Sequence, residues 1–249
     1  MSVNERLYNC EDPAVWRGIY GKYWTVVEAK SASKKGKGAG KLLALDKWFQ
    51  EELPAAISDR SERSLTHAEL AKIMEWKLTK GKFRPRLQQL IGSNSEEEVH
   101  SLTSEAFGLL PDVRAAITKL TKLKGVGPAT ASAVLVAGAP GEIAFMSDEA
   151  VESIAELRPV EYTAKHYALY LQKMLQKTSQ LNQADDQKDW TPHRVELCLW
   201  AWTVANQIQP SLLQEFSLIN VADKETNEKP GKRKRSDEKP SKRIKTDHS

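Results

Sequence analysis

The spacing of apolar residues predicts helices along most of this chain. Between residues 13 and 29, apolar side chains recur at intervals of three or four, which predicts one amphipathic helix with its tryptophans in the core. A second helix is expected from residue 42 to about residue 57, with a kink or an end at Pro54, because proline lacks a backbone N–H. No stretch alternates apolar and polar residues with a period of two, so the pattern favours an all-α fold.

Capping motifs predict where two further helices begin. Thr66 with Glu69, and Ser95 with Glu98, have the spacing of capping boxes, in which each side chain bonds the other residue's backbone N–H. The second of these helices is expected to run to about Phe107. Residues 31–41, SASKKGKGAGK, are rich in glycine, serine and lysine, which predicts a mobile loop that is either a solvated linker or a phosphate contact.

The helix that begins after Thr66 leads into a basic segment with interspersed aromatic residues. Cations there could bind phosphates while an aromatic ring stacks on a base. The candidate DNA and base contacts are Trp76, Lys80, Lys82, Arg84 and Arg86. The alternative is a helix with a basic C-terminal end, favourable to its dipole, followed by a turn at Gly81 and Pro85. The sequence supports both interpretations equally.

Residues 123–135 follow the pattern L-x-G-V-G-x-x-T-A-x-x-V-L, which places two glycines between two helical runs. We expect a helix-hairpin-helix over residues 112–138, with Pro111 starting its first helix. The N–H groups at the start of the second helix favour an anion such as a DNA phosphate. The candidate phosphate-binding residues are Gly125, Val126, Gly127, Ala129 and Thr130. On the other interpretation, the segment is only a tight turn between packed helices.

Composition narrows the class of protein. The chain has 249 residues, 40% of them hydrophobic and 28% charged, the balance of a soluble globular protein. No run approaches the roughly 18 apolar residues of a membrane span, so no membrane is expected. Two cysteines, Cys10 and Cys198, and no secretory signal indicate a reducing compartment inside the cell. No metal spacing pattern is present, and no cofactor is expected apart from a monovalent cation that the hairpin carbonyls could hold.

The formal charge of +4 comes from the C-terminal end. Of 37 Lys and Arg and 33 Asp and Glu, ten and six lie in residues 223–249, which leaves 27 of each sign elsewhere. Any DNA contact of the neutral body must therefore come from local patches. Residues 221–249 are predicted to be a disordered basic tail with a bipartite nuclear-localisation signal, or a non-specific phosphate binder. The signal residues are Lys232, Arg233, Lys234, Arg235, Lys242, Arg243 and Lys245.

Asp148 lies 23 positions after Gly125, beyond a short apolar link that ends in Phe145, Met146 and Ser147. This arrangement resembles the helix-hairpin-helix DNA glycosylase superfamily, and its F-x-x-D link is similar to that of the alkyl-base type. A later segment resembles the late helix of that type through Trp190, Pro192, Arg194, Leu199 and Trp200. The superfamily resemblance covers roughly residues 105–205, and about residues 1–215 are similar to the Amun-like proteins, an animal and fungal group described as glycosylases of this superfamily.

The resemblance implies a two-lobed, all-α fold over residues 1–220 and a nuclear DNA N-glycosylase of base-excision repair. Such an enzyme flips a modified base, and Asp148 would stabilise the positive charge that develops on the sugar. From the residues alone, Asp148 could also be the N-cap of a helix over 149–157. The implied partners are DNA and a nuclear import receptor, and the chain is expected to be a monomer.

Departures from the family pattern refine the hypothesis. Members of the family that also cleave the DNA strand use a lysine as an amine nucleophile at one of two positions. Those positions hold Thr118 and Ala129 here, which predicts an enzyme that releases the base without cleaving the strand. Ser147 replaces the usual proline or small apolar residue, and Glu149 follows the acid, so Glu149 is an alternative essential carboxylate. A second hypothesis is a nuclear DNA-binding or regulatory protein that keeps the fold without the reaction.

Overall fold

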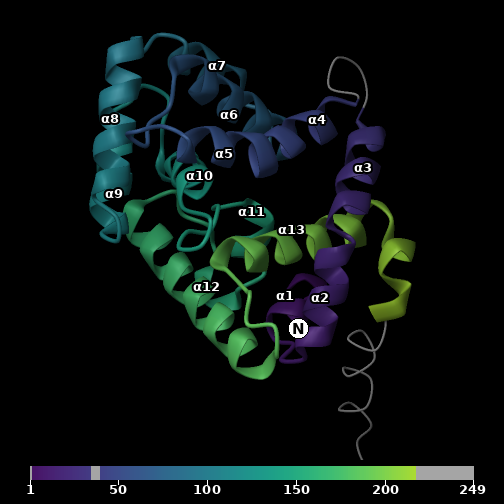
Figure 1. Cartoon of the computed structure of the whole chain (residues 1–249). Helices are drawn as coiled ribbons and strands as arrows, with labels where there is room; N and C mark the ends of the chain where they lie inside the picture. Colours follow the sequence, from purple (N-terminus) through teal and green to yellow (C-terminus); the bar gives the residue numbers. More distant parts are fainter. Residues whose placement is uncertain (1, 35–39, 217–249) are drawn as a thin grey trace, which may run out of the picture.

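The computed structural model describes residues 2–34 and 40–216, and every regular element within these ranges is helical (Figure 1). The all-α prediction is confirmed. Residues 35–39 of the predicted loop at 31–41 lie outside the described residues, and Ser31 and Ser33 belong to a helix. The predicted tail at 221–249 also lies outside them, with all its signal residues: Lys232, Arg233, Lys234, Arg235, Lys242, Arg243 and Lys245.

The helices form two groups, one above the other in Figure 1. The upper group contains α4 (Lys41–Lys47), α5 (Leu53–Ser58), α6 (His67–Lys80), α7 (Pro85–Ile91), α8 (Glu96–Gly108), α9 (Val113–Leu120) and α10 (Pro128–Gly138). The lower group joins the two ends of the described chain: α1 (Val3–Tyr8), α2 (Pro13–Gly21), α11 (Asp148–Glu152), α12 (Ala164–Ala184) and α13 (Pro192–Ile208). Helix α3 (Tyr23–Ser33) runs along the side from the lower group to α4 and packs against both α13 and α4. A π-turn (Trp48–Glu52) and 3₁₀ segments (Ala155–Leu157, Pro210–Phe216) complete the elements.

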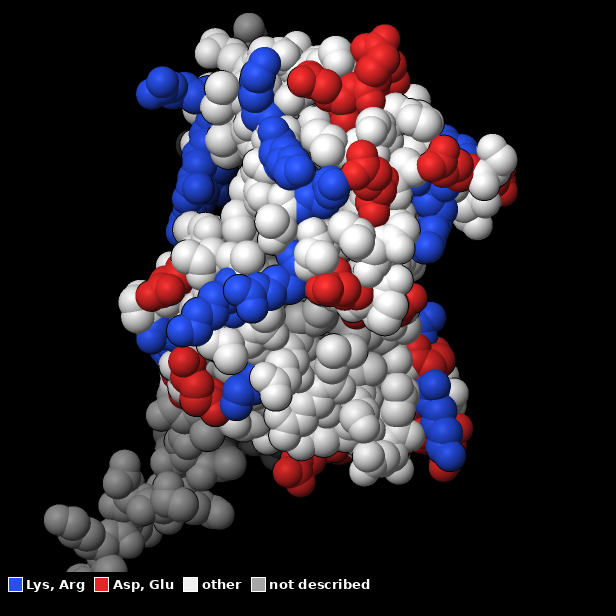
Figure 2. Space-filling model, turned by 90° about the vertical axis from the view of Figure 1, so that its left-hand side faces the viewer, with Lys and Arg blue, Asp and Glu red and all other residues white. Residues whose placement is uncertain are grey.

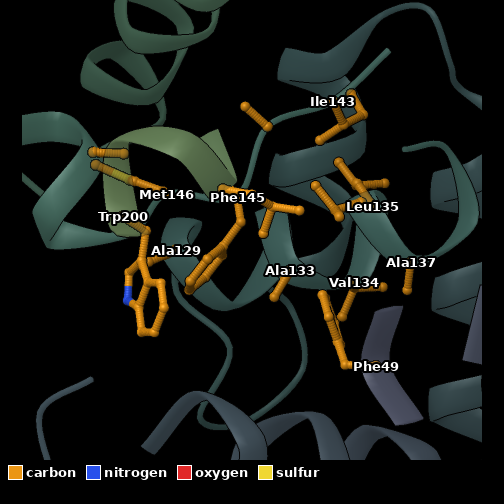
Figure 3. Close-up of a cluster of buried hydrophobic side chains, with 14 of the residues drawn as sticks. Phe49, Ala129, Ala133, Val134, Leu135, Ala137, Ile143, Phe145, Met146 and Trp200 are labelled. Atoms are coloured by element: carbon orange, nitrogen blue, oxygen red, sulfur yellow. The ribbon is translucent and has the colours of Figure 1, made fainter. Parts of the chain in front are cut away.

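α10 lies at the centre of the upper group. Its residues 129–137 are all buried, and it packs against α5, α6, α8, α9 and α12. Figure 3 shows Phe145, Met146 and Trp200 around Ala129 in its first turn, and Phe49 beside Val134 further along the helix. Because every side of α10 is packed, the position of its N-terminus is set by the core.

The capping boxes are confirmed. The Glu69 N–H donates to Thr66 Oγ1 at 3.2 Å and the Thr66 N–H donates to Glu69 at 2.9 Å. Ser95 and Glu98 make the same reciprocal bonds at 3.1 and 2.9 Å. These bonds occupy N–H groups that lack partners inside the helix, so α6 and α8 begin where the sequence predicts.

Three predicted boundaries were wrong or incomplete. The single helix expected at 13–29 is two helices, α2 and α3, joined at Lys22, which follows Gly21, a weak helix former. The helix around Pro54 continues through a π-turn, in which the Leu53 N–H bonds the Trp48 carbonyl, because this wider turn accommodates the proline ring. α9 begins at Val113 rather than Pro111, since the Asp112 carboxylate accepts the Ala115 N–H at 3.0 Å as its N-cap.

None of the described helices is both long and apolar enough to cross a membrane.

Candidate functional site

The hairpin turn between α9 and α10 contains glycines with different roles. Gly125 has a φ of +79°, in the left-handed region, and a Cβ there would lie 2.9 Å from the Leu90 Cβ and 3.2 Å from the Ile91 nitrogen. Glycine is therefore required at this position both for conformation and for packing against α7.

Gly127 is the N-cap of α10, with φ −98° and ψ 179°, which any residue adopts, and an added Cβ would meet nothing within 4 Å. No feature of the described fold requires glycine at this position. Gly127 is exposed, and the first N–H groups of a helix lack partners inside it. Ala129 and Thr130, as whole residues, are only 6% and 2% exposed, so the exposed part of this turn is at Gly127.

The link before Asp148 is held by hydrogen bonds with two helices, α10 and α12. The Met146 N–H donates to Ser132 Oγ of α10 at 3.0 Å. Two tyrosines of α12, Tyr167 and Tyr170, donate to the carbonyls of residues 144 and 145 at 3.0 and 2.9 Å. These contacts fix the position at which the acid leaves the link.

Asp148 is the first residue of α11, and Ser147 occupies the N-cap position. The N-cap interpretation of Asp148 was wrong, because its carboxylate turns to other partners: Tyr162 donates to Oδ1 at 2.6 Å, and Lys82 Nζ lies 2.8 Å from Oδ2. The helix is also shorter than expected, ending at Glu152. Burial raises the pKa of Asp148, but the bonds from Lys82 and Tyr162 outweigh it and lower the pKa below its usual value.

Asp148 and Ala129, in the first turn of α10, line the same cavity. This cavity has about 550 Å³ of empty space including its open mouth, and it lies where the two helical groups meet. Its lining residues are Lys77, Lys80, Gly81, Lys82, Arg84, Ala129, Phe145, Met146, Ser147, Asp148, Glu149, Tyr162 and Trp200. The structure therefore brings together the basic segment, the first turn of α10 and the acid.

Two of the predicted DNA contacts are interior residues, which corrects the sequence prediction. Trp76 is fully buried, stacks on Phe49 with ring centroids 3.6 Å apart, and donates its indole N–H to Asp46 Oδ1 at 2.6 Å. The Lys80 ammonium is 2% exposed at the inner wall of the cavity, 3.0 Å from Asp46 Oδ1. The Trp76 ring and the Lys80 ammonium are both occupied by contacts in the core, so neither is available to contact a DNA strand.

The other predicted contacts, Lys82, Arg84 and Arg86, lie at the surface, together with Phe83, which was not among the predicted contacts. Lys82 and Phe83 have exposed fractions of 66% and 76%, and both belong to the loop that joins α6 to α7. The Arg84 guanidinium lies 5.3 Å from the centre of the Tyr162 ring, and Arg86 is exposed at the start of α7. The loop therefore presents cations and an aromatic ring beside the mouth of the cavity.

Sequence reasoning missed several residues of the site. Tyr162 lies in the loop before α12, and no sequence pattern pointed to its hydrogen bond with Asp148. Ser147 donates its hydroxyl to Glu196 Oε1 at 2.6 Å, a bond that proline could not make. Glu196 is the one acidic residue of α13 and is fully buried; its occurrence in the apolar run VELCLWAW was an available signal. Burial raises its pKa to about 8.

The inner wall of the cavity includes the indole ring of Trp200. The Lys80 ammonium lies 3.9 Å from its centre, and the buried indole N–H has no hydrogen-bond partner among the described residues. A buried N–H without a partner is uncommon and costs about 1–3 kcal/mol. Among the same residues, no group of three or more His, Cys, Asp or Glu side chains could hold a metal ion. The cation at the hairpin carbonyls stays a prediction.

A comparison of the chain with protein-family models, curated proteins and solved structures finds no match.

Proposed function

We propose that this chain is a DNA N-glycosylase that hydrolyses the bond between a modified base and its sugar. One observation carries the proposal: the Asp148 carboxylate and the first turn of α10 line the same cavity. An acid beside a phosphate-binding turn is the arrangement that such a reaction needs, because the strand must be held while its sugar reacts. The resemblance of residues 105–205 to the helix-hairpin-helix glycosylases supports the same conclusion.

Hydrolysis of the N-glycosidic bond requires a carboxylate that is ionised at neutral pH. Cleavage of an N-glycosidic bond develops positive charge on the sugar, which a nearby negative charge stabilises. Lys82 and Tyr162 lower the pKa of Asp148, so the carboxylate is in the required form. Its side chain is 21% exposed, which leaves one side open to a sugar or a water molecule.

DNA would be held by several local contacts. The start of α10 at the exposed Gly127 suits one phosphate, and Lys82, Arg84 and Arg86 suit others. Phe83 can stack on a base, since its ring is 76% exposed beside these cations. Figure 2 shows that Lys and Arg side chains form bands across the upper half and the middle of one face, as binding by a neutral body requires. The basic motifs at 232–245 assign this activity to the nucleus as part of the same proposal.

The proposed enzyme releases the base and leaves the strand intact. Thr118 lies on the outer face of α9, and the neighbouring Lys119 pairs with Glu105 at 2.5 Å, so neither serves the cavity. Within the cavity, Lys80 and Lys82 are held by aspartates. An amine held in an ion pair is not free to act as a nucleophile, which disfavours covalent attack on the sugar by either lysine.

Base release tests the proposal. The purified protein is incubated with duplexes that each carry one alkylated, deaminated or oxidised base, and abasic sites are revealed by hot alkali. We expect at least one duplex to be cut after alkali and none before it. Asp148→Asn should slow release about 100-fold or more, because it removes the charge and keeps the size.

The exposed Asp186 provides the matched control, and Asp186→Asn should leave the rate unchanged. Strand cleavage without alkali would contradict the missing lyase step and direct attention to Lys77, whose pKa burial lowers. If no duplex loses a base while the protein binds DNA, the non-catalytic alternative replaces the enzyme. In either case Gly127→Ala should weaken DNA binding without altering the unfolding temperature, because an added Cβ meets no protein atom within 4 Å.

A further inference from the structure

Two carboxylic acids line the cavity, and the proposed function uses only one. Asp148 and Glu149 are the first two residues of α11, so their side chains leave the helix about 100° apart and reach the cavity from different directions. Asp148 is bound by Lys82 and Tyr162. Glu149 forms no ion pair within the described part of the chain, and its carboxyl group is partly buried.

The surroundings of Glu149 favour the protonated form. Lys30 of α3 and Lys80 of α6 face it, as do Asp148 on its own helix and Glu196 of α13. Burial raises the pKa of Glu149 even though the two lysines act in the opposite direction. The two adjacent carboxyls therefore have pKa values shifted in opposite directions, an arrangement that separates an acid from an ionised stabiliser.

The remaining lining residues give the cavity a basic character. Four cationic side chains line it, Lys77, Lys80, Lys82 and Arg84, against two acidic ones. Lys80 and Lys82 are paired with aspartates, whereas Lys77 and Arg84 form no ion pair among the described residues. A base with a fixed positive charge would be repelled by these groups, while a neutral base would not.

We propose that Glu149 is a second catalytic carboxyl group, which protonates the departing base, and that the substrate is a neutral modified base rather than a cationic alkylated one. The inference rests on the proposed glycosylase function. A base that already carries a positive charge leaves without help, so a positioned acid has a purpose only for a neutral leaving group.

The step balances as follows. The C1′–N bond breaks and its electron pair stays on the base, which takes the proton of Glu149 and leaves neutral. Asp148 stabilises the positive sugar until the oxygen of a water molecule adds to C1′. The proton released by that water restores the Glu149 carboxyl through solvent. The net reaction converts the nucleoside and one water into an abasic sugar and a free base.

The test compares three full-length proteins, wild type, Glu149→Gln and Glu97→Gln, under single-turnover conditions. Glu97 is an exposed residue of α8 and provides the matched control. The substrates are duplexes with a neutral purine, hypoxanthine or 8-oxoguanine, or a neutral pyrimidine, uracil, and a duplex with 7-methylguanine, whose ring carries a fixed positive charge. Rates are measured from pH 5 to pH 9, and thermal unfolding checks that each variant is folded.

We expect the wild type to release a neutral base faster than 7-methylguanine, with a rate that falls as rising pH removes the proton from Glu149. Glu149→Gln should lose about 100-fold or more on the neutral base and the alkaline fall with it. Its rate on 7-methylguanine should match that of the wild type, which a misfolded variant could not achieve.

Two results would overturn the inference while leaving the glycosylase proposal intact: preference of the wild type for 7-methylguanine, or equal loss by Glu149→Gln on both kinds of base. Release of no base by the wild type would overturn the glycosylase proposal itself, and this inference with it.

Discussion

Lys80 and Lys82 are close in the sequence, and each pairs with an aspartate, but the two pairs lie in different surroundings. Lys80 Nζ lies 3.0 Å from Asp46, and Lys82 Nζ lies 2.8 Å from Asp148. The first pair has side chains exposed by 2% and 0%, the second by 66% and 21%. Identical groups at similar distances therefore lie in opposite environments, and the environment decides what each pair can do.

The buried pair belongs to a polar cluster that ties helices together. Asp46 of α4 accepts hydrogen bonds from Tyr23 of α3 and Trp76 of α6, and Lys80 also donates to the Tyr23 hydroxyl at 2.5 Å. Every charged atom of the pair has a protein partner, so the role of this pair is to stabilise the fold. The exposed pair has solvent on one side, so in the proposed reaction a DNA phosphate would bind Lys82 and leave Asp148 free to face the sugar.

Breaking the buried pair should have the largest effect. Lys80→Met leaves the Asp46 carboxylate in the core without its cation, which costs about 3–5 kcal/mol of unfolding free energy. Urea unfolding followed by circular dichroism measures the loss. Lys122→Met, at an exposed lysine beside the hairpin, should change stability by about 0.5 kcal/mol at most. A loss below about 1 kcal/mol for Lys80→Met would show that the buried pair is not what joins these helices.

Replacing the buried acid Glu196 should alter the pH dependence of stability. Burial raises its pKa from 4.5 to about 8, so the unfolded state releases a proton that the folded state keeps, and stability falls as pH rises through this window. Burial lowers the pKa of His193 from 6.5 to about 3, so below pH 6.5 the unfolded state binds a proton that the folded state does not. His193 therefore makes stability fall as the pH decreases below 6.5. Between pH 6.5 and 8, above the range of His193, Glu196 contributes a slope of up to about 1 kcal/mol per pH unit.

Glu196→Gln keeps an acceptor for Ser147 and should remove this slope. Urea unfolding at several pH values in the window compares it with the wild type. A slope that persists in the variant would assign the titration to another group.

Breaking the exposed pair should have the smallest effect on stability and a specific effect on chemistry. Lys82→Met should cost less than about 1 kcal/mol, because solvent screens the pair. It should raise the pKa of Asp148, whose lowered value depends on this lysine. The acid limb of the base-release profile should therefore move to higher pH, and Lys122→Met should leave it in place. An unmoved limb with Lys82→Met would mean that Asp148 owes its ionised state to Tyr162 alone.

Much of the fold follows from the sequence because its signals are local. The capping boxes at Thr66 and Ser95 act within three residues, so the starts of α6 and α8 were predictable. The glycine at 125 was predictable as a turn because its left-handed backbone depends on the residue itself. The break at Lys22 was missed because apolar periodicity continues across it from α2 into α3.

In the candidate site, too, the features that depend on neighbouring residues were predictable, and those that depend on contacts between distant residues were not. The order of a glycine turn, an apolar link and an acid, and the mixture of aromatic and basic residues after Trp76, can be read from the residues alone. The packing of the helices is needed to show that Trp76 is interior while Phe83 is at the surface, and that Lys82, 66 positions before Asp148, is the partner of that acid. Burial and charge pairing depend on which helices meet, and those contacts join residues whose distance along the chain carries no signal.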